Sequence, residues 1–201
     1  TRLSSAALPL LEGCDAVCAF VNAEIDRAVI EGITQRGIKV LAMRCAGYNN
    51  VDFAAAYELG LTVVRVPAYS PYAVAEHAMA LLMTLNRRLH KAAMRTRDYN
   101  FSLVGLTGVD LHGKTAGVIG TGKIGRVFCD ICKGLGMRVL AYDVYPNPES
   151  GLEFVSFERL LEESDVISLH CPLTPATHHI INRETISKMK DGVLFINTSR
   201  G

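Results

Sequence analysis

Residues 115–143 read TAGVIGTGKIGRVFCDICKGLGMRVLAYD, and this stretch decides the fold. Its first five residues, 115–119, are apolar and partly β-branched, which predicts a buried strand. From Ile124 onward, apolar residues recur at the spacing of one helix face, until two glycines end the pattern. A second apolar run at 138–142 then leads directly into Asp143. The stretch therefore predicts a strand–helix–strand unit of a parallel sheet.

The turn between this strand and this helix is a G-x-G-x-x-G motif at 120–125. Glycines in such a motif allow a tight turn, a close backbone approach to a pyrophosphate and close packing of the helix on its strand. The helix N-terminus offers unpaired N–H groups and the positive end of a dipole. A bare glycine turn is the alternative interpretation, but the strand, helix and terminal acid all favour a dinucleotide site.

Asp143 stands where a carboxylate accepts hydrogen bonds from the adenosine ribose of such a ligand. No Arg follows it to hold a 2′-phosphate, so the sequence favours NAD over NADP as cofactor. The cofactor-binding residues predicted from this stretch are Gly120, Gly122, Lys123, Ile124, Gly125 and Asp143.

Composition excludes several classes of protein. The 201 residues are 49% hydrophobic and 20% charged with a net charge of +1, which is ordinary for a globular protein and favours neither nucleic acid nor membrane as a partner. Six cysteines in mostly apolar runs predict buried free thiols in a reducing compartment, and we expect a cytoplasmic protein. Cys129 and Cys132 have metal-like spacing but no second pair nearby, so no metal site is predicted.

The segment before the long central helix alternates strands with helices, which indicates a small parallel α/β unit. Strands are expected at 15–21, 39–43 and 62–66, and helices at 23–35, capped by Asn22, and at 53–59.

A long helix is predicted from Pro71 to about Lys91, with Ser70 as its N-cap. Its middle, residues 78–85, is apolar nearly all round, so we expect it to be buried between domains or between subunits. A homodimer or higher homo-oligomer formed through residues 71–91 is the corresponding expectation.

The remaining elements alternate in the same way. A loop with three glycines covers 100–113. Two further helices are expected, one at 157–163 capped by Ser156 and one at 183–189 capped by Asn182. Two further strands are expected at 165–169 and 193–197. The chain begins with Thr1 and ends at Gly201 directly after a strand, which we interpret as an excerpt of a longer protein.

Several separate motifs carry a family resemblance that covers essentially the whole chain. Together with the glycine motif, the segments HCPLTP from His170 and NTSRG from Asn197 resemble the D-isomer-specific 2-hydroxyacid dehydrogenases. RCAGYNNVD from Arg44, VPAYSP from Val66 and AEH from Ala75 match the same family. Within it, the chain looks most like the bacterial fermentative D-lactate dehydrogenases.

The resemblance implies a fold of two α/β domains. Residues 1–70 would be part of a flavodoxin-like substrate domain, and residues 71–201 a Rossmann-type, doubly wound parallel sheet that binds NAD and is incomplete at its C-terminus. The family also uses a Glu and a His that lie beyond these 201 residues, so we expect the chain made alone to be inactive or nearly so.

Arg200 is the first candidate for the catalytic site. Its guanidinium offers a planar fork for a 2-keto acid, and the resemblance implies that it binds the substrate and polarises the carbonyl. The N–H groups of Ala46 and Gly47 would hold the substrate carboxylate, although a simple strand-to-helix turn is the alternative. Tyr69 would bond the same carboxylate, or it is a half-buried structural Tyr.

His170 is not predicted to be the catalytic acid, because the matching family segment lines the adenosine end of the cofactor pocket. The further cofactor-lining residues implied by the resemblance are His170, Cys171, Pro172, Thr177, Thr198 and Ser199.

The resemblance thus implies NAD-dependent interconversion of pyruvate and D-lactate, with the substrate in the interdomain cleft. Two alternatives stay open: another D-2-hydroxyacid as substrate, or a non-catalytic NAD-responsive binding protein of the same family.

Overall fold

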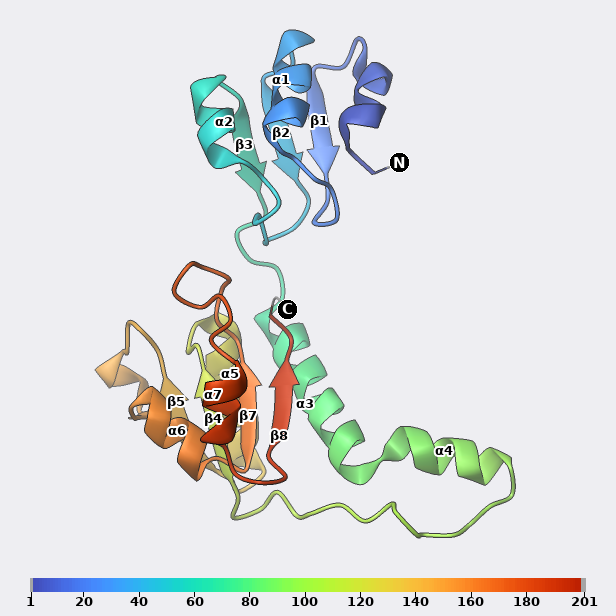
Figure 1. Cartoon of the computed structure of the whole chain (residues 1–201), viewed down its shortest axis with the longest axis vertical. Coiled ribbons are helices and arrows are strands. Elements are labelled where there is room, and N and C mark those ends of the chain that lie inside the picture. The colour runs from blue at the N-terminus through green and yellow to red at the C-terminus, as the bar shows by residue number, and fades with distance from the viewer. Residues whose placement is uncertain (1, 200–201) are drawn as a thin grey trace. The chain divides into compact units, whose positions relative to one another are not determined.

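The computed structural model describes residues 2–199 (Figure 1). The chain divides into two compact units, the first ending at Tyr69 and the second beginning at Ser70. Each unit has its own parallel sheet, so the expectation of an α/β fold is confirmed.

The first unit is a three-stranded parallel sheet in the order β1-β2-β3, with helices on one face. Its elements are the 3-10 helix η1 (Ser5–Leu11), β1 (Ala16–Ala19), α1 (Arg27–Gln35), β2 (Val40–Met43), α2 (Phe53–Glu58) and β3 (Thr62–Arg65). Because each helix joins two neighbouring strands, consecutive strands lie side by side in register, as when Val17 pairs with Leu41.

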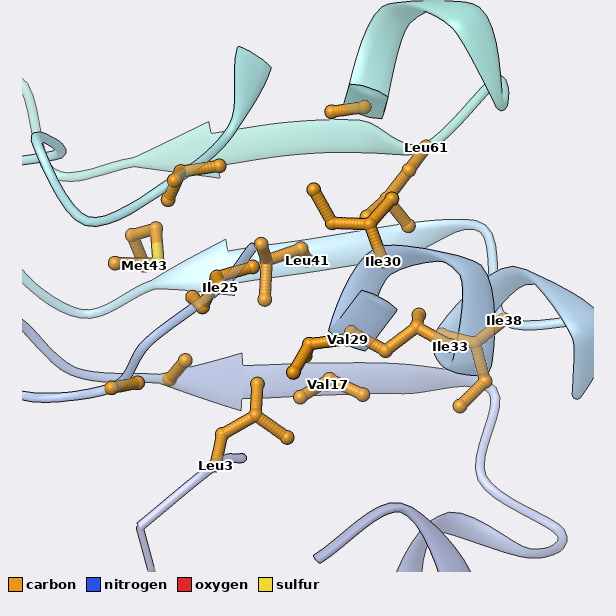
Figure 2. Close-up of a cluster of buried hydrophobic side chains, with 14 of the residues drawn as sticks. Leu3, Val17, Ile25, Val29, Ile30, Ile33, Ile38, Leu41, Met43 and Leu61 are labelled. Atoms are coloured by element: carbon orange, nitrogen blue, oxygen red, sulfur yellow. The ribbon is translucent and has the colours of Figure 1, made fainter. Parts of the chain in front are cut away.

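The core of this unit fills the space between the sheet and α1 (Figure 2). Val29, Ile30 and Ile33 of α1 lie against Val17 of β1 and Leu41 of β2, and all five are at least 95% buried. The strands alternate, so that in β1 the side chains of Ala16 and Cys18 stay exposed while their neighbours are buried. One face of the sheet therefore carries the core of the first unit.

The start of α1 corrects the sequence expectation. The helix begins at Arg27 and is capped by Asp26, whose side chain accepts a hydrogen bond from Val29 N at 2.9 Å, rather than by Asn22. Residues 23–25 are held in a non-helical path because Ile25 forms a parallel bridge with Val51. This pairing buries Ile25 fully, and tertiary packing overrides the local helical pattern.

The second unit is a five-stranded, entirely parallel sheet in the order β6-β5-β4-β7-β8. Its strands are β4 (Thr115–Ile119), β5 (Arg138–Tyr142), β6 (Glu153–Phe154), β7 (Val166–Leu169) and β8 (Leu194–Asn197). The chain runs outward from β4 to β6 and then crosses to β7 and β8, which is the winding of a Rossmann-type sheet. The short edge strand β6 was not predicted, because its two residues are too few to form a recognisable pattern.

Helices cover both faces of this sheet. Its helices are α3 (Pro71–Arg87), α4 (Leu89–Arg97), α5 (Lys123–Gly134), η2 (Pro148–Ser150), α6 (Phe157–Glu163) and α7 (Arg183–Ser187). Ala116 and Val118 of β4 pack in the core with α3 and α5, whereas Ile119 packs with α6. Ser156 and Asn182 cap α6 and α7 as expected, although α7 ends at Ser187 rather than at 189.

The long helix also differs from its prediction. It ends at Arg87, and Arg88 takes a left-handed conformation with φ of 50°, after which α4 starts in a new direction and extends away from the sheet (Figure 1). One face of α3 buries Ala75, Ala78 and Leu82. A neighbouring face leaves Leu81 and Leu85 exposed by 41% and 46%.

The cysteines only partly follow expectation. All six are free thiols, and Cys45, Cys129 and Cys132 are buried, but Cys14 and Cys18 are exposed. Cys18 is exposed because it lies on the uncovered face of β1, a distinction that an apolar run does not reveal. Within the described residues, no helix combines the length and hydropathy needed to cross a bilayer.

Candidate dinucleotide site and carboxylate-binding loop

The glycine turn lies at the carboxyl end of the central strand β4, between its two neighbours. Gly120 N donates to Tyr142 O of β5 at 2.9 Å, and His170 N after β7 donates to Ile119 O at 2.8 Å. Gly120 has φ of 90°, and a Cβ there would stand 2.7 Å from Cys171 N. Only glycine fits this turn, because the backbone after β7 passes directly against it.

The other two glycines differ sharply in their surroundings. A Cβ on Gly125 would stand 1.9 Å from Gly120 O, so the first turn of α5 packs on the strand end without room for a side chain. A Cβ on Gly122 would meet nothing within 4 Å. Gly122 is the N-cap of α5, and no side chain caps the helix. The arrangement leaves open space in front of helix N–H groups, which fits an incoming pyrophosphate.

Both carboxylate oxygens of Asp143 accept hydrogen bonds, and one of them binds the glycine turn. Oδ2 accepts hydrogen bonds from Thr121 N at 2.6 Å and from Thr121 Oγ1 at 2.9 Å, and Oδ1 accepts one from Tyr145 N at 3.0 Å. Burial by itself would raise the pKa of Asp143, but these hydrogen bonds outweigh it and hold the pKa below its ordinary value. The carboxylate is therefore ionised and fixed, as an acceptor for ribose hydroxyls must be.

His170 packs against α5, next to the glycine turn. Its ring lies 5.0 Å from the ring of Phe128 on α5, and its Nε2 is 2.9 Å from Ser168 Oγ. Burial lowers the pKa of His170 to about 4, so the imidazole is neutral at physiological pH. Nδ1 is buried without a hydrogen-bond partner among the described residues. A neutral imidazole is a weak proton donor, and the exclusion of His170 as the catalytic acid stays a prediction.

The loop after β7 is organised by Thr177. Its Oγ1 donates to Pro172 O at 2.6 Å and accepts from Thr174 N at 2.8 Å, which closes the segment on itself. Cys171 is half-buried, and burial raises the pKa of its thiol. The hydroxyl of Thr177 is thus used within the loop, and its predicted contact with the cofactor stays a prediction.

Two predicted residues after β8 lie next to the end of β7. Ser199 Oγ donates to Leu169 O at 3.1 Å, which brings residue 199 to the edge that carries the glycine turn. Thr198 Oγ1 is buried and has no hydrogen-bond partner among the described residues. Arg200, the first candidate of the sequence, lies outside the described residues.

The predicted carboxylate-binding residues belong to the first unit. Ala46 and Gly47 follow β2 and are half-buried, and neither N–H has an acceptor among the described residues. Arg65 Nη1 donates to Ala46 O at 3.1 Å. Tyr69 is the last residue of the first unit and is 71% exposed, and its predicted contact with a substrate carboxylate stays a prediction.

A cavity of the second unit lies elsewhere. It measures about 620 Å³ and opens at the amino ends of β4, β7 and β8, where it is lined by Arg88, Lys91, Lys114, Lys190 and other residues. The glycine turn is at the opposite, carboxyl ends of the same strands. Ligands of open α/β sheets bind at the carboxyl ends, so the candidate cofactor site is at the glycine turn rather than in this cavity. Among residues 2–199, no group of three or more His, Cys, Asp or Glu side chains converges as a metal site would.

Sequence reasoning missed two residues that shape the site. Thr121 binds Asp143 through both its N–H and its hydroxyl, and its place between two motif glycines was the available signal. The hydroxyl of Ser168 lies within hydrogen-bond distance of His170 Nε2. The available signal was that the two residues are two positions apart, which puts both side chains on one face of a strand.

Comparison with known proteins shows which family has this sequence and fold. Residues 79–201 match the family described as the D-isomer specific 2-hydroxyacid dehydrogenase, NAD binding domain. The chain is 60% identical over 192 residues to D-lactate dehydrogenase of Escherichia coli (strain K12), a match that covers 94% of this chain and 58% of that protein. It is 54% identical over 202 residues to a 2-hydroxyacid dehydrogenase homolog of Haemophilus influenzae, covering 99% of this chain and 61% of that protein. The chain therefore spans about three fifths of the length of these curated relatives.

Solved structures give the same result. The structure of apo D-lactate dehydrogenase from Escherichia coli matches with a TM-score of 0.91 at 57% identity, over 100% of this chain and 64% of that one. D-lactate dehydrogenase from Aquifex aeolicus, solved with NAD and lactic acid, matches with a TM-score of 0.87 at 39% identity, over 96% of this chain and 59% of that one. The family match confirms NAD as the predicted cofactor, and it confirms the Rossmann-type fold. The chain belongs to the D-isomer specific 2-hydroxyacid dehydrogenases, and residues 79–201 match their NAD-binding domain.

Proposed function

We propose that the full-length protein is an enzyme that interconverts pyruvate and D-lactate with NADH and NAD. The observation that carries this proposal is the 60% identity to a relative named D-lactate dehydrogenase, together with an intact glycine turn and ribose-binding acid. NADH, when bound, supplies the hydride that reduces the keto carbon.

The cofactor would be held by residues of the second unit. Open space at Gly122 and the uncapped start of α5 receive the pyrophosphate, with Lys123, Ile124 and the backbone of Gly120 and Gly125 around it. The fixed carboxylate of Asp143 accepts hydrogen bonds from the ribose. The rest of the cofactor surface is proposed to be lined by His170, Cys171, Pro172, Thr177, Thr198 and Ser199. Among the described residues, the buried atoms Thr198 Oγ1 and His170 Nδ1 have no hydrogen-bond partner, so they could bond a ligand or water.

The substrate would be held through its carboxylate. The unpaired N–H groups of Ala46 and Gly47 bind that carboxylate, and the exposed hydroxyl of Tyr69 reaches the same group. Arg200 pairs with the substrate oxygens and polarises the carbonyl, a role proposed from the family motif NTSRG. A cytoplasmic location belongs to this proposal, because NADH is supplied there and free thiols stay reduced.

We also propose that the protein is a homo-oligomer through α3. This helix exposes Leu81 and Leu85, and Leu89 is 52% exposed at the start of α4. Leucines at this spacing on a helix are a surface that a second copy would cover. Light scattering of the full-length protein and of its Leu85→Glu variant tests this, because the charged variant should shift toward monomer.

The activity is tested by NADH oxidation with pyruvate, 2-ketoisocaproate and phosphohydroxypyruvate as separate substrates. We expect pyruvate to be turned over fastest, and Arg200→Lys to lose most of this activity because lysine keeps the charge but lacks the fork. Fastest turnover of another keto acid would move the assignment to a different D-2-hydroxyacid. NADH binding without reduction of any keto acid would support the non-catalytic NAD-responsive alternative.

A further inference from the structure

The loop that carries Ala46 and Gly47 is reached by a side chain from the neighbouring strand. Arg65 is the last residue of β3 and pairs in register with Met43, the last residue of β2. Both strands are parallel, so their ends meet at the same edge of the sheet. The long side chain of Arg65 can therefore extend across to the loop that begins after Met43.

The guanidinium of Arg65 is used on backbone oxygens rather than on a carboxylate. Its Nη1 lies 3.1 Å from Ala46 O, and the carbonyls of Val66 and Pro67 lie at the outer limit of hydrogen bonding, 3.4 and 3.5 Å away. No carboxylate of the described residues lies within ion-pair distance of Arg65. The shortest of these contacts is the one to Ala46 O, and no carboxylate of the described residues neutralises the charge.

The same guanidinium also lies over an aromatic ring of the loop. Its Cζ lies 4.8 Å from the centroid of the Tyr48 ring, and Tyr48 in turn contacts Phe53 edge-on, with centroids 5.5 Å apart. A cation over a ring face is attracted to it. Tyr48 belongs to the loop itself, so Arg65 is fixed between that ring and the carbonyl of Ala46.

The position of the Ala46 carbonyl fixes the direction of the next N–H group. In a trans peptide, the C=O of one residue and the N–H of the following one point in opposite directions. With the Ala46 carbonyl turned toward Arg65, the Gly47 N–H must point away from it, and that N–H has no acceptor among the described residues. Cys45 Sγ donates to Gly47 O at 3.2 Å and fixes the next peptide as well.

From this geometry we infer that Arg65 is a positioning residue: it orients the Ala46–Gly47 peptide so that the Gly47 N–H is presented to the carboxylate of a 2-keto acid. The inference rests on the proposed function and adds to it the side chain that sets the loop. Arg65 acts through the peptide and does not touch the substrate. Its positive charge polarises the peptide and strengthens the N–H as a donor.

Kinetics of three variants of the full-length protein test this inference. Arg65→Met removes both the hydrogen bond and the charge. Arg65→Lys restores a donor and a charge without the fork. Arg44→Met is the matched control, because Arg44 is at the same sheet edge over the Phe20 ring at 4.8 Å but has no hydrogen bond to the loop carbonyls.

We expect Arg65→Met to raise KM for pyruvate, and the inhibition constant of its isosteric amide oxamate, about tenfold or more with kcat changed by less than threefold. Arg65→Lys should recover part of the loss, and Arg44→Met should change KM by less than threefold. NADH affinity and melting temperature should match wild type in all three, since a merely structural role would lower them. The inference is overturned if KM stays within twofold in Arg65→Met, if Arg44→Met has the same effect, or if NADH affinity falls in parallel.

Failure of the proposed function has a different signature. If the wild-type protein reduces no 2-keto acid, the proposed function fails, and a crystal structure of Arg65→Met then decides the positioning role. An Ala46–Gly47 peptide rotated away from its wild-type direction would support that role. An unchanged peptide would refute it.

Discussion

Gly122 and Gly125 lie only three residues apart in the sequence, but replacing each with alanine should separate folding from cofactor binding. Gly125→Ala places a methyl group 1.9 Å from Gly120 O, whereas ordinary contact begins at 3.4 Å, so backbone would have to move by 1.5 Å. Neither partner is a flexible side chain, because one belongs to the strand end and the other to the first turn of α5. We expect a loss of about 3 kcal/mol in the free energy of unfolding, typical of a severe overpacking change.

Gly122→Ala is the matched change in empty space. Its φ is −64°, which alanine adopts without strain, and nothing lies within 4 Å of the new methyl group. The free energy of unfolding should therefore stay within about 0.5 kcal/mol of wild type. The methyl group occupies the space proposed for the pyrophosphate, so NADH affinity should fall about a hundredfold, equivalent to ~2.7 kcal/mol.

The assay is a pair of measurements on the full-length protein and both variants: urea unfolding and fluorescence titration with NADH. The expected pattern is a stable Gly122→Ala protein that binds NADH poorly and an unstable Gly125→Ala protein. Wild-type NADH affinity in Gly122→Ala would show that the pyrophosphate does not approach this position. Wild-type stability in Gly125→Ala would show that the tight packing of α5 on β4 is not required.

Three further predictions follow from buried polar groups and thiols. Asn86→Ala should lower the free energy of unfolding by about 2 kcal/mol in urea titrations, because the Asn86 side chain bonds both the N–H and the C=O of Val109, at 2.9 and 2.8 Å. Both groups would lose this partner, and an effect below about 0.5 kcal/mol would contradict the prediction. Because burial lowers the pKa of His170 from 6.5 to about 4, only the unfolded chain takes up this proton between those pH values, and the free energy of unfolding should fall as pH falls through that range. The melting temperature of His170→Asn should depend less on pH there, and an unchanged slope would argue against burial of the neutral ring. Burial raises the pKa values of the Cys129 and Cys132 thiols to about 12, so both should react with a thiol reagent only after unfolding, while exposed Cys14 and Cys18 react at once. Fast labelling of all six thiols would contradict the buried packing of α5.

Regular local patterns were sufficient to predict most of the second unit. The strand at 115–119, the capped helix at 157–163 and the strand at 138–142 have the predicted bounds, because periodicity and caps are encoded within a few residues. The strand-to-helix turn and its terminal acid were equally visible, since each motif glycine answers a local steric demand.

Features set by distant contacts were not predictable in this way. Asp26 rather than Asn22 caps α1 because Ile25 bridges to Val51, which lies 26 residues further along the chain. The left-handed Arg88 divides a helix whose pattern continues across it. Arg65 has no motif at all, and its importance follows only from the carbonyl of Ala46, which lies on a neighbouring loop.

The placement of β4 in the middle of its sheet has a consequence for biosynthesis. Both neighbours of β4, and the backbone of Cys171 that packs 2.7 Å from the Cβ position of Gly120, come later in the chain. A ribosome adding about 5–20 residues per second needs several seconds to pass from Gly120 to Cys171. During that interval the glycine turn exists as sequence without the backbone that shapes it. The nascent chain thus acquires its cofactor surface only when β7, on the far side of β4, has emerged, whereas β1, β2 and β3 of the first unit are synthesised in their spatial order.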